Sequence, residues 1–278
     1  MSTAGTVGRF RRQTFVESVA QAFPRRGIFD GVRRRFRGAY ERLLTAGSDS
    51  LTSVLPEGEV VRIAPEQRHM TWNLLEYQAL RAAVRPGDTV IDAGANVGCY
   101  AILFGRWVGQ SGRVYAFEPD PRAFEGLTRH IALNGLDGIV TPIRAAISDR
   151  PRASAPFTLA VSSGVSRLAA SKERDTIGVA ATSIDDFCAQ ARISPRVIKI
   201  DVEGAELDAL RGARDTIAQV KDLRLFVEMH PSLWLASGIT ARDLQKECDA
   251  QRLTVEPIDG VSGDVWAIEG ITMRVKHS

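Results

Sequence analysis

The sequence has 278 residues, of which 44% are hydrophobic and 25% are charged. This composition is typical of a globular protein with a substantial core, and it excludes a disordered, collagen-like or disulfide-stapled chain. No apolar run approaches the roughly 20 residues that a membrane-spanning helix needs, and the N-terminus lacks a secretory signal pattern. The three cysteines, Cys99, Cys188 and Cys248, have no CxxC spacing. We therefore expect a cytoplasmic protein without a transmembrane segment.

The chain has a net charge of +3, and its excess of positive charge lies at the N-terminus, where residues 1–45 contain ten arginines and three acidic residues. Apolar residues recur every fourth position over 28–44 with arginines between them, which predicts an amphipathic helix. This helix would pack on the main domain, cover an active site, or contact an anionic membrane or phosphorylated acceptor. Because the remaining chain is slightly acidic, we expect no nucleic-acid partner. The oligomeric state stays open.

Two parts of the chain are expected, a basic helical N-terminal extension at 1–58 and one large domain at 59–278. In the second part, short β-branched runs alternate with helical patterns, which predicts an α/β fold. Strands are expected at 89–92, 113–118, 139–146, 197–201, 223–228, 253–257 and 265–268, and helices at 71–84, 99–108, 121–134, 184–191, 205–217 and 240–250. Two strand-like pieces within 149–181 indicate a hairpin insertion.

The segment VIDAGANVG at 90–98 leads from a buried strand through glycines into a helix. In doubly wound folds, such a turn forms a nucleotide crevice at the carboxyl edge of the sheet. Glu118 ends the next strand, where its carboxylate can accept both hydroxyls of a ribose. Asn96 stands where a dinucleotide fingerprint has glycine, and Asp92 suits an ammonium group better than a pyrophosphate. The motif favours S-adenosylmethionine over NAD, and a plain turn capped by Asp92 is the alternative.

The segment VIKIDVEGAE at 197–206 places two further acids, Asp201 and Glu203, after another apolar strand. Carboxyl ends of parallel strands meet at one edge, so these acids should lie near the first motif. Glu206 is expected in the first turn of the following helix, where the helix dipole favours a carboxylate. Asp201 and Glu203 are therefore candidate catalytic residues.

A third segment, LFVEMHP at 225–231, brings Glu228 and His230 to that edge on the next strand. Imidazole titrates near neutral pH, so His230 is placed like a general base. Alternatively, Asp201, Glu228 and His230 bind Mg²⁺ or Mn²⁺, which would lower the pKa of a substrate hydroxyl. The sequence does not decide between the base and the metal.

Taken together, VIDAGANVG, FEPDP, Asn134, AAISD, IKIDVEGAE and FVEMH resemble the FkbM-type family of S-adenosylmethionine-dependent O-methyltransferases. The resemblance covers residues 68–270. It implies a class I methyltransferase domain, with a Rossmann-like seven-stranded sheet, helices on both faces and an antiparallel last strand. The glycine loop would hold the methionine end of the cofactor, Glu118 its ribose and Ala146 its adenine. The candidate cofactor-binding residues are Asp92, Gly94, Ala95, Asn96, Gly98, Glu118, Pro119 and Ala146.

The predicted acceptor is a small molecule or glycan, namely a sugar, a glycolipid or a glycosylated or polyketide natural product. Its contacts are expected from Ser162, Ser163, Arg167, Trp72, Tyr77 and Trp234. A nicotinamide-dependent oxidoreductase is an alternative, disfavoured by Asn96 and by the absence of a Tyr-x-x-x-Lys pair. A non-catalytic binding module on the same scaffold is another.

Overall fold

A computed structural model describes residues 49–158, 167–168, 176–258 and 264–277. The chain divides into two compact units, of which one ends at Leu74 and the other runs from Leu75 to Ser278. In the first unit, β1 (Leu51–Val54) pairs antiparallel with β2 (Val60–Ile63), and the short 3-10 helices η1 (Pro56–Gly58) and η2 (Pro65–Gln67) follow the two strands. The expected basic helix at 28–44 lies outside the described residues.

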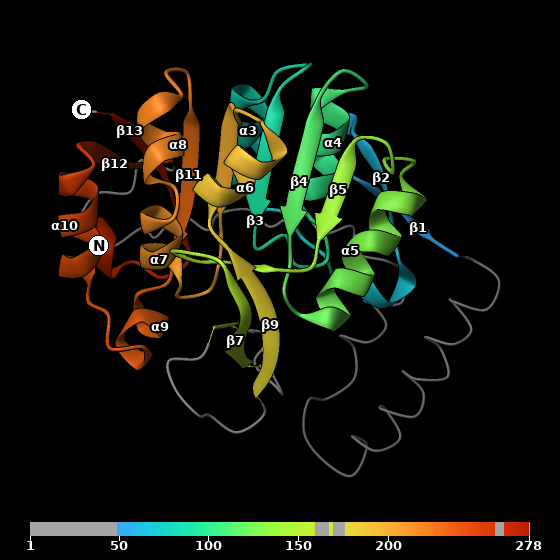
Figure 1. The fold of residues 1–278 in the computed structure, drawn as a ribbon. Helices are drawn as coiled ribbons and strands as arrows, with labels where there is room; N and C mark the ends of the chain where they lie inside the picture. Colours follow the sequence, from blue (N-terminus) through green and yellow to red (C-terminus); the bar gives the residue numbers. More distant parts are fainter. Residues whose placement is uncertain (1–48, 159–166, 169–175, 259–263, 278) are drawn as a thin grey trace, which may run out of the picture. The chain divides into compact units, whose positions relative to one another are not determined.

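The second unit contains a seven-stranded sheet in the order β12-β13-β11-β10-β3-β4-β5 (Figure 1). Its strands are β3 (Thr89–Ala93), β4 (Arg113–Phe117), β5 (Val140–Ile143), β10 (Val197–Ile200), β11 (Arg224–Met229), β12 (Leu253–Pro257) and β13 (Ile271–His277). The five strands from β5 to β11 are parallel, whereas β13 runs antiparallel to both of its neighbours. This topology confirms the class I methyltransferase fold, including its antiparallel last strand.

Helices cover both faces of this sheet (Figure 1). The α-helices of the described residues are α3 (Leu74–Ala83), α4 (Ala101–Val108), α5 (Pro121–Leu133), α6 (Ile184–Ala191), α7 (Glu206–Arg211), α8 (Arg214–Gln219), α9 (Pro231–Ala236) and α10 (Ala241–Ala250). Side chains at the helix starts explain several boundaries. Asp120 caps α5 by accepting from the amide of Arg122, and Ser183 caps α6 by accepting from the amide of Asp186.

Three expected elements are wrong in detail. The helix expected at 205–217 is two helices, α7 and α8, because Asp185 replaces the bond that would join them: its N–H donates to the carbonyl of Gly212 at 2.8 Å, and its Oδ1 accepts the N–H of Thr216 at 2.8 Å. The strand expected at 139–146 ends at Ile143. The strand expected at 265–268 is a 3-10 turn, η3 (Val265–Ala267), capped by Asp264, and the last strand is β13. Helix α9 was not predicted.

The hairpin insertion is confirmed, with longer strands than expected. Strand β7 (Arg152–Thr158) pairs antiparallel with β9 (Thr176–Thr182), and β6 (Ala146–Ile147) and β8 (Arg167–Leu168) complete a second sheet in the order β6-β9-β7-β8. Its buried side chains, including Phe157 and Val179, form a small apolar cluster of their own. In Figure 1, β7 and β9 extend beyond the carboxyl ends of β3 and β4, which is the edge that carries the site.

The core of the second unit lies around the central strands. All four residues of β10 are buried, as expected for a parallel strand covered on both faces. Full burial of each isoleucine here contributes about 1.5 to 3 kcal/mol. At the amino end of the strands, the Nε of Arg196 lies 2.8 Å from Asp88.

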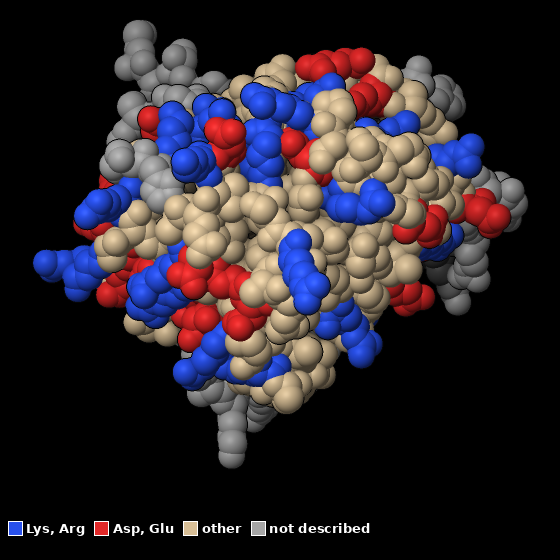
Figure 2. Space-filling model, turned by 45° about the horizontal axis from the view of Figure 1, so that its top comes forward, with Lys and Arg blue, Asp and Glu red and all other residues tan. Residues whose placement is uncertain are grey.

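Acidic and basic side chains are interspersed on the face drawn in Figure 2. Within the described residues, no helix is both long and apolar enough to cross a bilayer.

Candidate active site

The carboxyl edge of the sheet brings the predicted motifs together. Strands β4, β3, β10 and β11 lie side by side in parallel, so the acids at or just after their ends share one edge. A pocket opens there, between the loops after β3, β4 and β10 and the start of the insertion. The pocket is lined by Gly94, Asn96, Glu118, Pro119, Asp120, Ala123, Ala146, Ile147, Phe157, Asp201, Val202, Glu203 and Ala205.

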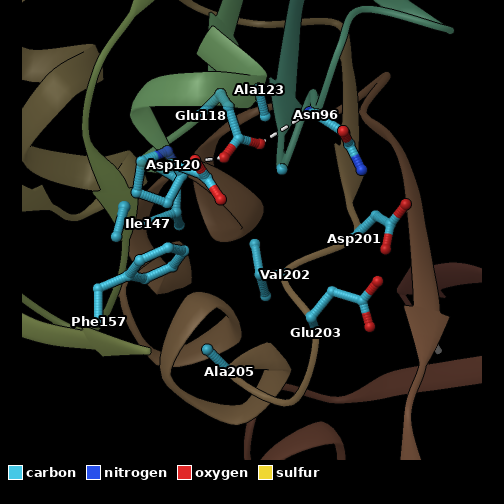
Figure 3. A pocket seen from close by; sticks show the side chains of 13 residues that line it. Asn96, Glu118, Asp120, Ala123, Ile147, Phe157, Asp201, Val202, Glu203 and Ala205 are labelled. Atoms are coloured by element: carbon cyan, nitrogen blue, oxygen red, sulfur yellow. Dashed lines mark hydrogen bonds between the residues drawn. The ribbon is translucent and has the colours of Figure 1, made fainter. Parts of the chain in front are cut away.

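The walls of this pocket differ in chemistry (Figure 3). Ile147 and Phe157 form an apolar wall on one side, and Asp201 and Glu203 lie on the opposite side. Glu118 stands between these walls. The pocket therefore offers an apolar end, a carboxylate in the middle and an acidic end.

Glu118 is buried and its carboxylate is held by two main-chain amides. Oε2 accepts from the N–H of Asn96 at 2.8 Å, and Oε1 accepts from the N–H of Asp120 at 2.7 Å. Burial raises the pKa of Glu118 to about 7, although these two hydrogen bonds act to lower it. Each oxygen keeps a second lone pair, so the fixed carboxylate suits the two hydroxyls of a ribose.

The glycine loop depends on backbone conformations that ordinary residues avoid. Gly94 has a φ of +84°, and a Cβ there would lie 1.7 Å from the carbonyl oxygen of Asp201. Only glycine permits this approach between the β3 and β10 loops. Asn96 has a φ of 50°, and asparagine is one of the few other residues that adopts this conformation readily. This explains why asparagine fits at position 96, where a dinucleotide fingerprint has glycine.

Three candidate cofactor residues lie outside the pocket lining. Ala95 is buried and donates its N–H to Phe117 at 2.9 Å, whereas Gly98 packs against Leu127 of α5. Asp92 is 1% exposed, and neither of its carboxylate oxygens has a hydrogen-bond partner among the described residues. Burial raises the pKa of Asp92 to about 7 against the lowering effect of Lys199. Such a carboxylate fits a cationic donor group brought by a ligand.

His230 is the centre of an acidic cluster at the end of β11. Its Nδ1 lies 2.7 Å from Oε1 of Glu206. Its Nε2 lies 3.3 Å from Glu203, 3.8 Å from Asp201 and 3.9 Å from Glu228, measured to the nearest carboxylate oxygen. The structure thus brings together all three candidate catalytic residues, with Glu228 beside them.

The pKa of His230 differs from the near-neutral value expected from its residue type. Burial alone would lower it, but the hydrogen bond to Glu206 and the charges of Glu206, Glu203 and Asp201 raise it to about 9. His230 therefore carries a proton at neutral pH in this arrangement. The sequence placed the histidine correctly but not the number of carboxylates around it.

Lys199 is a component of the site that sequence reasoning missed. It is 2% exposed in the middle of β10, and its Nζ lies 2.8 Å from Asp201 and 3.8 Å from Glu76. The ammonium also faces the ring of Tyr100 at 5.2 Å. Burial acts to raise the pKa of Asp201, but the charge and hydrogen bond of Lys199 outweigh this effect, so the pKa lies below its ordinary value. A lysine within the apolar run VIKI was the available signal, because a buried lysine needs a partner.

Asp201, Glu203 and His230 also have a geometry that suits a metal ion. One ligand atom from each lies within 4.8 Å of the others. Two carboxylates and an imidazole are a donor set that Mn²⁺ and other divalent cations accept. This set contains Glu203, whereas the set suggested by the sequence contained Glu228 in its place.

The expected acceptor wall is wrong for two of its aromatic residues. Tyr77 is fully buried and packs edge-on against Trp107. Trp234 is 1% exposed and donates its indole N–H to Glu206 at 2.5 Å. Trp72 belongs to the other unit. Ser162 and Ser163 lie outside the described residues, as does the side chain of Arg167.

Comparison with known proteins places this site in a family. Residues 92–249, more than half of the chain, match the family model described as the methyltransferase FkbM domain. Hexuronic acid methyltransferase AglP of Haloferax volcanii is 26% identical over 172 residues, which are 61% of this chain and 64% of that protein. Methyltransferase 1 of Beauveria bassiana is 27% identical over 151 residues, which are 47% of this chain and 60% of that protein. The chain thus spans less than two thirds of the length of either relative.

Solved structures to which this chain is similar include an S-adenosylmethionine-dependent O-methyltransferase of Thermotoga maritima. It is 14% identical, with a TM-score of 0.44, and the match covers 85% of this chain and 80% of that one.

Proposed function

Because the chain belongs to the FkbM methyltransferase family, we propose that it is an S-adenosylmethionine-dependent O-methyltransferase. Its acceptor in this proposal is a hydroxyl of a sugar, a glycolipid or a glycosylated or polyketide natural product. One observation carries the proposal: Asp201 and Glu203 both line the pocket and face Nε2 of His230. A methyl donor bound in the pocket would therefore end beside the group that takes a proton.

The chemistry of the pocket walls supports one orientation of the cofactor. The adenine would lie against the apolar side formed by Ile147 and Phe157, and Glu118 would accept hydrogen bonds from the ribose. The methionine end would then lie near the glycine loop, where the carboxylate of Asp92, which has no hydrogen-bond partner in the described part of the chain, suits its ammonium group. When bound, the cofactor supplies a methyl group attached to a sulfonium sulfur, and the rest of the cofactor is left as a neutral thioether.

His230 has the position and basicity to accept the proton of the acceptor hydroxyl. The O–H bond breaks as the new O–CH₃ bond forms, and the proton moves to Nε2. The neutral imidazole must be available for this step, and a pKa of about 9 leaves it scarce at pH 7. A positive charge bound nearby lowers the pKa of His230, because like charges disfavour the protonated ring. His230 would therefore lose its extra proton more readily with a sulfonium bound beside it.

The proposed acceptor class is drawn from a relative of this chain. The name of the Haloferax volcanii relative supports a sugar, and a uronic acid offers several hydroxyls. Cys188 and Cys248 form no disulfide within the described residues, which supports our proposal of a cytoplasmic location. We keep peripheral membrane contact of the basic N-terminal helix, and the absence of a nucleic-acid partner, as proposals.

A divalent cation is a second candidate for activating the hydroxyl, favoured by the spacing of Asp201, Glu203 and His230. Turnover measured with and without a chelator separates the two mechanisms. Activity that survives chelation leaves His230 as the base, whereas a loss that Mg²⁺ or Mn²⁺ restores assigns hydroxyl activation to the metal.

Titration calorimetry with S-adenosylhomocysteine and with NAD tests the cofactor. The proposal expects binding of the first and no response to the second. Tight binding of NAD alone would instead favour the oxidoreductase alternative, and binding of S-adenosylhomocysteine without methyl transfer to any hydroxyl would favour the binding module.

A further inference from the structure

Glu206, the first residue of α7, has a hydrogen-bond pattern that its helical position does not explain. Its side chain is fully buried, although it is not among the residues that line the pocket. Three donors converge on this one carboxylate. Oε1 receives the main-chain N–H of Gly204 at 2.9 Å and lies 2.7 Å from Nδ1 of His230, and Oε2 receives the indole N–H of Trp234 at 2.5 Å.

The chemistry of these partners decides where the proton of His230 lies. The amide of Gly204 and the indole of Trp234 are donors only, so both oxygens of Glu206 must be acceptors. An ionised carboxylate has no hydrogen to offer. Nδ1 of His230 must therefore be the donor in its short contact with Oε1. The other ring nitrogen, Nε2, faces Glu203, Asp201 and Glu228 at 3.3 to 3.9 Å.

We propose that Glu206 is a positioning residue that keeps a proton on Nδ1 of His230, so that Nε2 is the ring nitrogen that turns its lone pair towards the site. This inference rests on the proposed function for the identity of the base. It assigns a role to an acid that the sequence places merely in a first helical turn. Trp234 contributes by holding the second oxygen of the carboxylate, which fixes the plane in which Oε1 meets the imidazole.

A glutamine at position 206 cannot reproduce this pattern. If its oxygen replaces Oε1, its NH₂ group meets the N–H of Trp234. If the amide is turned over, its NH₂ group faces the N–H of Gly204 and Nδ1 of His230. Because the NH₂ group can only donate, Nδ1 must then be the acceptor, and the ring proton moves to Nε2. The E206Q variant thus either leaves a buried donor unmatched or selects the wrong tautomer of His230.

Nitrogen-15 NMR of histidine-labelled protein reads the tautomer without any turnover. The His230 signal is assigned by its loss in H230N, and spectra are taken above the pH at which the ring becomes neutral. We expect a protonated Nδ1 and an unprotonated Nε2 in the wild-type protein, and the same in W234F, because the bond to Nδ1 uses the other oxygen. A protonated Nε2 in the wild-type protein would overturn the proposal.

Kinetics of E206Q test the consequence for catalysis. We expect kcat to fall about 10- to 10²-fold while KM for the cofactor changes less than about twofold, because the residue orients the base and does not line the pocket. E247Q is the matched control, since Glu247 is also a buried carboxylate with several donors, namely Arg211, Arg214 and Gln251. It should lose stability and keep kcat.

An unchanged kcat in folded E206Q would also overturn the proposal. If E206Q does not fold, the tautomer in the wild-type protein and in W234F decides the matter. If no acceptor is ever methylated while the tautomer is as expected, the proposed function fails and the positioning of His230 by Glu206 stands.

Discussion

Replacing Lys199 with methionine should destabilise the protein strongly at neutral pH. The ammonium is 2% exposed and lies 2.8 Å from Asp201 and 3.8 Å from Glu76, which is itself buried. Removing it leaves these acids, and the nearby Asp92, without the cation that offsets their charges. Breaking a buried ion pair on one side costs about 3 to 5 kcal/mol. That is a large part of the roughly 5 to 15 kcal/mol that stabilises a typical domain.

The pH dependence of this loss gives the sharper test. The pKa of Lys199 is raised well above 10.5, so its contribution is fully present below that pH and is lost as pH rises through the folded pKa. In K199M the folded-state pKa values of Asp201 and Asp92 should rise. The variant then binds more protons when folded than when unfolded, and its deficit shrinks as pH falls from 7 to 5.

Urea denaturation of both proteins at pH 7 and pH 5 measures these free energies of unfolding. K276M is the control, because the ion pair of Lys276 with Glu256 is largely exposed and should matter much less. A deficit of K199M below about 1 kcal/mol at pH 7, or one that does not change with pH, would refute the reasoning.

E118A should weaken binding of S-adenosylhomocysteine by about 1 to 3 kcal/mol in calorimetry, because two ribose hydroxyls lose their acceptor; an unchanged affinity would remove Glu118 from the cofactor site. H230A should lower turnover by about 10²- to 10⁴-fold with cofactor affinity unchanged. In the wild-type protein, kcat/KM should rise with pH towards about 9, since the neutral imidazole forms only as pH approaches that pKa, and this limb should vanish in H230A. Deletion of residues 1–45 should leave a thermal transition and cofactor binding but impair turnover, and unchanged kinetics would exclude a role as a lid.

The sheet edge could be predicted because its signals are local. Apolar runs that end in Asp92, in Asp201 and in the pair Glu228 and His230 indicate buried parallel strands, and parallel strands deliver their ends to one edge. The helix at 184–191 was predicted for the same reason, since its helical pattern is local, and Ser183 caps it before an acidic first turn. These elements needed no knowledge of distant contacts.

The features that could not be predicted depend on residues far apart in the sequence. Glu206 meets His230 and Trp234 across 24 and 28 positions. Helix α9, which carries Trp234, begins at Pro231 and has only six residues, too few for a clear helical pattern. The raised pKa of His230 is the sum of several carboxylates from different loops. The run at 265–268 looked like a strand by composition, but the antiparallel pairing with β11 selected Ile271–His277 instead.

Transfer of a labelled methyl group from S-adenosylmethionine to a polyhydroxylated acceptor tests the central claim most directly. The purified chain is incubated with a panel of hexoses, hexuronic acids and their glycosides, with H230A as the control, and the products are analysed by mass spectrometry and NMR. The account predicts one methyl ether on a sugar hydroxyl, formed by the wild-type protein and strongly reduced in H230A. A methyl group found on nitrogen, carbon or a carboxylate, or equal yields from both proteins, would contradict it.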